Sequence, residues 1–86
     1  YTVPLEESLI IGRNPAQAQM PFPQDTLLSG AHCRLNYQSG QLYVTDMGST
    51  NGTYLNGVPI TATKPLQQDD VILIGSMQLR VSWRSL

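Results

Sequence analysis

The sequence predicts an all-β fold, a sandwich or barrel of short strands. Apolar residues alternate with polar ones over residues 32–37, 41–45 and 77–83, which is the pattern of half-buried strands. Turn residues such as Asn-Gly and Ser-Gly recur about every ten residues, and no long stretch carries apolar residues three and four apart. Frequent turns between short strands are typical of sandwiches and barrels, in which the loops carry function.

The strand regions can be placed in chain order. Residues 32–37 and 41–45 predict a hairpin, because Gln-Ser-Gly at 38–40 supplies a turn between two alternating segments. Residues 71–74, Val-Ile-Leu-Ile, are apolar on both sides and indicate a more fully buried strand. Residues 77–83 indicate a half-buried strand. The residues expected in the core are Cys33, Leu35, Leu42, Val44, Val71, Leu73, Leu79, Val81 and Trp83.

Length and composition describe one small folded domain. The 86 residues are 41% hydrophobic and only 13% charged, which suits a packed core and leaves little room for an enclosed active site. A surface site is therefore expected. Because the chain begins at Tyr1 and not at Met, we expect residues 1–86 to be a single domain excised from a longer protein.

Charge and cysteine content exclude several classes of partner. The net charge is −1 and the five basic residues are scattered, whereas nucleic-acid binding needs a concentrated basic surface. A single cysteine and a single histidine give no metal-ligand spacing, so neither a metal nor another cofactor is expected. No apolar run is long enough to insert across a membrane. The lone cysteine favours a reducing, cytoplasmic setting.

Four loop segments each combine a glycine with hydrogen-bond donors: residues 11–14, 29–32, 48–53 and 55–57. A phosphate monoester carries about −1.5 to −2 charges at pH 7, so its receptor needs a firm cation and several neutral donors. Arg13 offers the cation, and Ser29 and Thr50 offer hydroxyls. The glycines let backbone N–H groups approach closely. The donor set therefore fits a phosphate site.

The order of these segments resembles the forkhead-associated (FHA) domain family. The shared pattern is Gly-Arg at 12–13, Ser-x-x-His at 29–32, Ser-Thr-Asn-Gly-Thr at 49–53 and Asn-Gly at 56–57, followed over 66–75 by an acidic turn, an apolar strand and a glycine. The resemblance implies the SMAD/FHA type of β-sandwich, with about eleven strands and the binding loops at one end. It also implies a phosphothreonine-dependent adaptor or signalling module that catalyses no reaction.

The resemblance implies a role for each matched residue. Arg13 and Ser29 resemble the residues that bind the phosphate, and Gly30 would add a backbone N–H. Thr50 resembles the residue that reaches the phosphorylated side chain, and Asn51 resembles the asparagine that binds the peptide backbone. The residues expected to support the loops are Gly12, His32, Gly52 and Gly57, with His32 as a buried brace that does not touch the ligand.

Specificity is expected to depend on residues at the edge of the site. Many relatives carry a basic residue just before the Ser-x-x-His segment, where this chain has Leu27 and Leu28. If one of these leucines points outward, we expect an aliphatic preference about three residues after the phosphothreonine. Asn56 is expected either to order its own loop or to lie at the rim of the site.

Two chemical alternatives use some of the same residues. Ser29, His32 and Asp46 could be arranged as a hydrolase triad, but the chain lacks the strand-turn-helix elbow that exposes a nucleophile. Asp46 is better explained as a turn cap that accepts backbone N–H bonds. The adjacent Asp69 and Asp70 could suggest a metal, but such a pair before an apolar strand is more often a solvated turn.

The expected partner is a threonine-phosphorylated protein, or a phosphorylated segment that flanks this domain in the same chain. Either partner implies an upstream Ser/Thr kinase. The rival hypothesis is an assembly module that keeps the fold and binds through other faces. The intact set of Arg13, Ser29, Thr50 and Asn51 argues against that rival.

Overall fold

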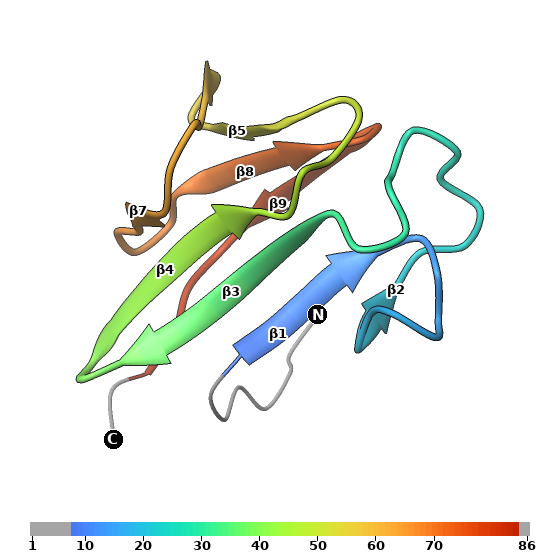
Figure 1. The fold of residues 1–86 in the computed structure, drawn as a ribbon. Helices are drawn as coiled ribbons and strands as arrows, with labels where there is room; N and C mark the ends of the chain where they lie inside the picture. The colour runs from blue at the N-terminus through green and yellow to red at the C-terminus, as the bar shows by residue number, and fades with distance from the viewer. Residues whose placement is uncertain (1–7, 85–86) are drawn as a thin grey trace.

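Two β-sheets form the fold (Figure 1). The computed structural model describes residues 8–84, and within this range the chain forms nine strands and no helix, so it also holds no helix that could span a membrane. The prediction of an all-β, two-layered fold is confirmed. Since the described part holds nine strands, the count of about eleven stays an expectation.

The first sheet has the strand order β2-β1-β3-β4-β7. Its strands are β1 (Ser8–Gly12), β2 (Met20–Pro21), β3 (Cys33–Gln38), β4 (Gln41–Asp46) and β7 (Lys64–Pro65). The predicted hairpin is confirmed as β3 and β4, which pair from Cys33–Asp46 to Gln38–Gln41. Ser39 and Gly40 join them with φ angles of 52° and 81°, the left-handed geometry that matches the twist of a tight hairpin.

The second sheet has the order β6-β5-β8-β9 and is antiparallel throughout. Its strands are β5 (Thr53–Leu55), β6 (Val58–Pro59), β8 (Val71–Ile74) and β9 (Met77–Arg80). The strand predicted to reach residue 83 therefore ends three residues earlier. Beyond Arg80, Val81 N donates to Asp70 O and Val81 O accepts from Asp69 N. Asp69 has a left-handed φ of 68°, so the backbone that faces Val81 is a turn and no longer an extended strand.

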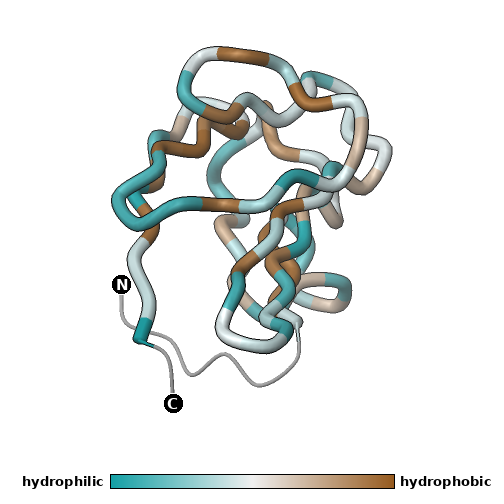
Figure 2. The backbone as a smooth tube through the Cα atoms, turned by 90° about the vertical axis from the view of Figure 1, so that its left-hand side faces the viewer, coloured by the Kyte–Doolittle hydropathy of each residue, from teal (hydrophilic) through white to brown (hydrophobic). Residues whose placement is uncertain are grey.

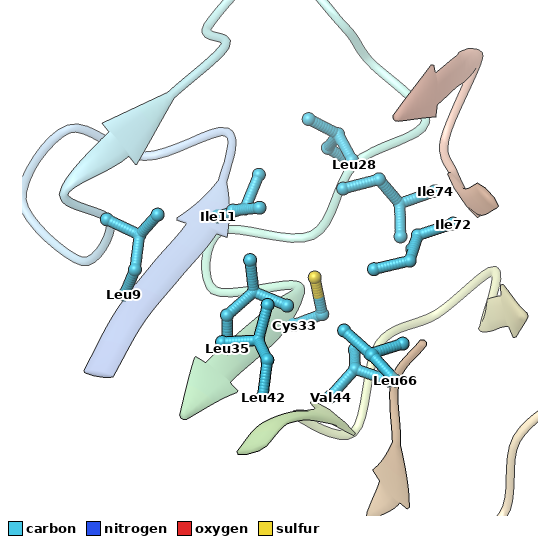
Figure 3. Packing of buried hydrophobic residues seen from close by; sticks show 10 residues of the cluster. All are labelled: Leu9, Ile11, Leu28, Cys33, Leu35, Leu42, Val44, Leu66, Ile72 and Ile74. Atoms are coloured by element: carbon cyan, nitrogen blue, oxygen red, sulfur yellow. The ribbon is translucent and has the colours of Figure 1, made fainter. Parts of the chain in front are cut away.

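Apolar side chains from both sheets fill the space between the layers (Figure 3). The prediction was wrong about the phase of β8, because Ile72 and Ile74 are fully buried and Val71 and Leu73 are only half-buried. A run that is apolar on both sides contains no polar residue to fix its phase. Leu79, Val81 and Trp83 are half-buried against the cluster, which consists of Leu9, Ile11, Leu28, Cys33, Leu35, Leu42, Val44, Leu66, Ile72 and Ile74.

Three loops gather at one end of the sandwich: β1–β2 (13–19), β2–β3 (22–32) and β4–β5 (47–52) (Figure 1). Ser76, in the β8–β9 turn, donates to Asp25 Oδ2 and so joins that turn to the same end. Because Leu55 pairs with Ile72 and Thr53 with Ile74, the β5–β6 turn lies at the other end of β8. Hydrophobic and hydrophilic residues follow one another along the chain (Figure 2).

Candidate functional site

Ser29 is the point at which the three loops meet. Its carbonyl oxygen accepts a hydrogen bond from Arg13 N at 2.9 Å, and its Oγ accepts one from Thr50 N at 2.9 Å. Its own N–H donates to His32 Nδ1 at 3.1 Å. Residues that are far apart in the sequence are thus held around a single serine.

Arg13 follows the last residue of β1 and is exposed. Asn14 N donates to Gly30 O at 3.2 Å, so the chain on both sides of the Arg13 carbonyl is tied to the 29–30 segment. Within residues 8–84 the guanidinium has no hydrogen-bond or ion-pair partner. It is therefore free to pair with an anion in fork geometry.

Neutral donors lie on the segments that meet at Ser29, to which the Arg13 main chain is tied. The Ser29 hydroxyl accepts from Thr50 N, which leaves its own proton for another acceptor. In the described part of the chain, neither Gly30 N–H nor the hydroxyl of the exposed Thr50 has a hydrogen-bond partner. One cation with two hydroxyls and a backbone N–H is a donor set suited to a phosphate.

Asn51 links two of the loops through its side chain. Its Nδ2 donates to Leu27 O at 2.9 Å, so the β4–β5 loop is tied to the β2–β3 loop. The residue is exposed, and this bond uses only one of its two amide protons. The remaining proton and Oδ1 have no hydrogen-bond partner in the described part of the chain.

His32 lies below the loops and is fully buried. Its Nδ1 accepts from Ser29 N, so Nε2 carries the proton and donates to Gly52 O at 2.7 Å. Both ring nitrogens are used between two loops, as expected of a brace. The hydrolase arrangement is not formed, because Nδ1 bonds the Ser29 main chain and the Ser29 hydroxyl bonds Thr50.

Asp46, the last residue of β4, closes the turn that carries Thr50 and Asn51. Its carboxylate accepts from Ser49 N at 3.1 Å, from Ser49 Oγ at 2.5 Å and from Thr53 Oγ1 at 2.7 Å. Burial alone would raise the pKa of Asp46, but these hydrogen bonds and the nearby His32 together lower it below the ordinary value. Asp46 is therefore the turn cap that the sequence indicated.

The two leucines before Ser29 point in different directions. Leu27 is 50% exposed, whereas Leu28 is 3% exposed and packs in the core (Figure 3). Asp25 Oδ1 accepts from Leu27 N and Asp25 O accepts from Leu28 N, which forms a turn that sends consecutive side chains to opposite sides. The expected specificity contact therefore narrows to Leu27, and Leu28 is a core residue.

Asn56 and Gly57 do not lie near the three loops. They form the β5–β6 turn at the other end of β8, with φ angles of 49° and 86°. The Asn56 amide donates to Asp70 Oδ1 at 3.0 Å and accepts from Val71 N at 2.9 Å. A rim position for Asn56 was wrong, since both ends of its amide order its own turn, and Gly57 supports that turn and not the site. An Asn-Gly pair indicates a turn, but it does not indicate at which end of the sandwich that turn lies.

Asp25 is a supporting residue that sequence reasoning missed. Its Oδ2 accepts from Ser76 N at 3.1 Å and from Ser76 Oγ at 2.8 Å, which fixes the β2–β3 loop against the β8–β9 turn. The Ser76 hydroxyl is the main cause that lowers the pKa of Asp25. An Asx turn to Leu27 could have been predicted from Asp25, but nothing local points to a partner 51 positions away.

A shallow groove of about 550 Å³ lies beside the loops. Its lining comes from β2, residues 22–25 and the turn at 76–77. Asp25 is the charged residue in this lining, and its lowered pKa keeps it negative. The negative charge of Asp25 therefore makes this groove unfavourable for a phosphate.

The sequence matches the family model described as the FHA domain over residues 9–75. It is similar to E3 ubiquitin-protein ligase CHFR from Xenopus laevis, with 40% identity over 68 residues that make up 74% of this chain and 11% of that protein. It is also similar to the FHA domain-containing protein FhaB from Mycobacterium tuberculosis, with 32% identity over 76 residues, 88% of this chain and 48% of that protein. The chain thus spans between about a tenth and a half of these relatives.

Solved structures of the same fold include FHA domains studied with phosphothreonine. One, from an analysis of phosphothreonine-dependent FHA domain interactions, has a TM-score of 0.85 and 34% identity and covers 100% of this chain and 85% of its own. The MEK1 FHA domain, in complex with a phosphothreonine peptide of HOP1, has a TM-score of 0.78 and 30% identity over 93% of this chain and 85% of its own. The model match and these similarities show that the chain belongs to the FHA domain family.

Proposed function

We propose that this domain binds threonine-phosphorylated segments of other proteins and catalyses no reaction itself. The observation that carries the proposal is the meeting of three loops at Ser29: the main chain around Arg13, whose guanidinium has no partner within residues 8–84, is tied to the Ser29–Gly30 segment, and Thr50 is tied to the Ser29 hydroxyl. The MEK1 FHA domain binds a phosphothreonine peptide of HOP1 on a similar fold, which supports a phosphothreonine ligand here.

The phosphate supplies most of the discrimination in this proposal. Hydrogen bonds to a charged group are worth about 1.5–3 kcal/mol each, so losing the phosphate removes several such contacts. Only a few peptide residues reach the loops besides the phosphothreonine. We therefore expect an affinity of about micromolar, equivalent to about −8 kcal/mol.

The rest of the peptide is held by Asn51 and Leu27. Asn51 lies in the β4–β5 loop and keeps Oδ1 and one amide proton for a peptide main chain. Leu27 presents a half-exposed aliphatic side chain next to it, since its own carbonyl is the acceptor for Asn51. An aliphatic peptide residue about three positions after the phosphothreonine would bury its surface there.

Neither His32 nor Cys33 is available as a general base or a nucleophile. Both nitrogens of His32 bond the backbone, and burial followed by the charge of Asp46 raises the pKa of Cys33 to about 12. A thiol with so high a pKa carries almost no thiolate at neutral pH. The proposal is thus a binding module that docks a protein marked by a Ser/Thr kinase in the cytoplasm, where Cys33 stays a free thiol.

The test is a titration of a phosphothreonine peptide library and its unphosphorylated counterpart against wild type, Arg13→Ala and Arg80→Ala. Arg80 ends β9 at the opposite end of the second sheet and is exposed, so its loss is a matched change of charge. Wild type should prefer the phosphorylated library. Arg13→Ala should weaken binding about 10- to 100-fold, the equivalent of one charged contact, and Arg80→Ala should not. Equal binding of both libraries by wild type would refute the proposal.

The same library tests Leu27. Wild type should select aliphatic residues about three positions after the phosphothreonine, and Leu27→Arg should shift the selection at that position toward Asp and Glu. The phosphothreonine requirement should persist, because Arg13 and Ser29 are unchanged. An unaltered selection in the Leu27→Arg variant would remove Leu27 from the peptide contact.

A further inference from the structure

Gln17 lies directly over Gly30 on the β1–β2 side of the site. A Cβ atom placed on Gly30 would lie 2.1 Å from Gln17 Oε1 and 3.3 Å from its Cδ. Gly30 is not among the glycines with positive φ, so its backbone conformation is open to any residue. The absence of a side chain at position 30 therefore leaves room for the Gln17 amide.

The position of Gln17 is set by the main chain. Gln17 N and Ala18 N both donate to Asn14 O at 2.9 Å, and Asn14 N donates to Gly30 O. Ala18 is 7% exposed, which anchors the far side of this turn against the protein. The turn is therefore fixed on both sides of Gln17, and it is fixed to the 29–30 segment.

The amide of the Gln17 side chain is available for a ligand. It is exposed, and its amide makes no hydrogen bond with another residue of the described range 8–84. The neighbouring Gln19, by contrast, uses its Oε1 to accept from Ile10 N at 2.7 Å. Rotation of the terminal amide of Gln17 exchanges Oε1 and Nε2 within nearly the same volume, so an N–H donor can be presented above Gly30.

We propose that Gln17 is a further phosphopeptide-binding residue, whose side-chain amide donates a hydrogen bond to the phosphate. The inference rests on the proposed function, because it places the phosphate between Arg13, Ser29 and the N–H of Gly30. A phosphate oxygen that accepts a hydrogen bond from Gly30 N–H would lie next to the residue against which the Gln17 amide is placed. Phosphate oxygens accept several bonds each, and a neutral donor adds one without a further charge.

The sharpest variant is Gln17→Glu, which keeps the shape of the side chain and places a negative charge beside the phosphate. Binding of a phosphothreonine peptide should weaken by about tenfold or more, through like-charge repulsion. Gln17→Ala, which only removes the donor, should weaken it by about threefold. The peptide should be one selected by wild type from the library, measured by isothermal titration.

The matched control is Gln67→Glu. Gln67 is exposed, and its N–H donates to Asp70 Oδ2 in the turn before β8, at the end of the domain that carries Asn56. The Gln67→Glu substitution adds the same negative charge as Gln17→Glu, but away from the site. Its affinity should stay within about twofold of wild type, because a distant exposed charge is largely screened by salt.

A second variant tests the contact with Gly30 without any charge. Gly30→Ala introduces a methyl group where the Gln17 amide lies and displaces that flexible side chain. Gly30→Ala and Gln17→Ala should each weaken binding, and the double variant should lose less than the sum, because both changes remove the same amide from the phosphate. Strictly additive losses would contradict the shared contact.

The outcomes separate the two proposals. If wild type fails to prefer the phosphopeptide, the proposed function is lost and Gln17 has no phosphate to bind. If wild type binds and Arg13→Ala weakens binding, but Gln17→Glu and Gln67→Glu behave alike, the inference is overturned and the proposed function stands. Unchanged unfolding midpoints in urea show that the exposed substitutions leave the fold intact.

Discussion

Single atoms of Ser29 and His32 hold the binding loops in place before any ligand arrives. Ser29 uses its carbonyl, hydroxyl and amide on three different residues, and His32 uses both ring nitrogens on two loops. The entropy of ordering these loops is therefore lost when the domain folds and not when it binds. An ordered set of donors raises affinity without adding a contact.

Replacing His32 tests this brace. His32→Ala leaves the part-buried Ser29 N–H and Gly52 carbonyl without their partner and opens a cavity where the fully buried ring lay. Lost hydrogen bonds and a cavity at a buried site together predict a loss of about 3 kcal/mol in the free energy of unfolding. Urea unfolding should show a lower midpoint, and titration should show weaker phosphopeptide binding. A stable variant with unchanged affinity would show that the loops need no brace.

Asp46 predicts how stability depends on pH. Because its folded pKa is lowered, the stability that it contributes is present above the unfolded pKa of about 3.9 and is lost as pH falls through the folded pKa. The free energy of unfolding, measured in urea from neutral pH to pH 2, should decline less steeply in Asp46→Asn than in wild type below pH of about 4.

Asp69→Asn is the control for that series. Asp69 is exposed, it has no side-chain hydrogen bond in the described part of the chain, and Asn suits its left-handed φ of 68°. This variant should keep the acid decline of wild type. If Asp46→Asn also kept it, the hydrogen bonds of Asp46 would not be the cause.

At the scale of elements, the site depends on how closely the end of β1 approaches the 29–31 segment. A Cβ on Gly12 would lie 2.1 Å from Gly30 O and 3.0 Å from Ala31 Cα, and both are backbone atoms that cannot turn away. The space that a side chain would need is taken by the neighbouring chain. Gly12 is thus the residue that lets Arg13 and Ser29 share one site.

Gly12→Ala should therefore affect both stability and binding. We expect a loss of about 3 kcal/mol in the free energy of unfolding, as for overpacked sites, and displacement of Arg13 from Ser29. Gly57→Ala is the control: it is strained by a φ of 86° but meets no atom within 4 Å, and it lies at the other end. It should cost about 1–2 kcal/mol and leave phosphopeptide affinity unchanged. Equal losses of affinity in the two variants would contradict the role of Gly12.

The elements also show what the sequence could and could not predict. The β3–β4 hairpin followed from strict alternation around a turn, and the meeting of Arg13, Ser29, Thr50 and Asn51 followed from a resemblance that carries long-range order. The phase of β8 could not be predicted, because its residues are all apolar. The end occupied by Asn56 depends on the pairing of β5 with β8, and the turn of Leu27 and Leu28 depends on a hydrogen bond of Asp25. The strand pairing is long-range, whereas the turn at Asp25 is local and could have been predicted as an Asx turn.

At the scale of the whole molecule, one cluster of buried side chains joins the two sheets (Figure 3). Cys33 begins β3 in the middle of this cluster and is fully buried beneath the loops that His32 braces. Burial raises its pKa to about 12, so the thiol is both inaccessible and protonated in the folded protein. Only an opening of the core exposes it.

Cys33 is therefore expected to report global unfolding. A disulfide reagent at pH of about 8 should not react with native protein, and it should react at once in denaturing urea, where the thiol pKa returns to about 8.5. The labelling rate should rise with urea concentration in step with the change in tryptophan fluorescence that accompanies unfolding, because the same opening of the core controls both. Fast labelling of native protein in the absence of urea would show that the loop end opens separately from the core.

The main-chain anchoring of the loops also has a consequence for how recognition can change. Arg13 and Asn14 are tied to the 29–30 segment through backbone atoms, so exchange of a neighbouring side chain leaves the tie intact. Positions 16 and 27 combine exposure with a main chain that is held by hydrogen bonds. Evolution or a combinatorial library can vary these positions and redirect the domain to new phosphorylated partners while its framework stays the same.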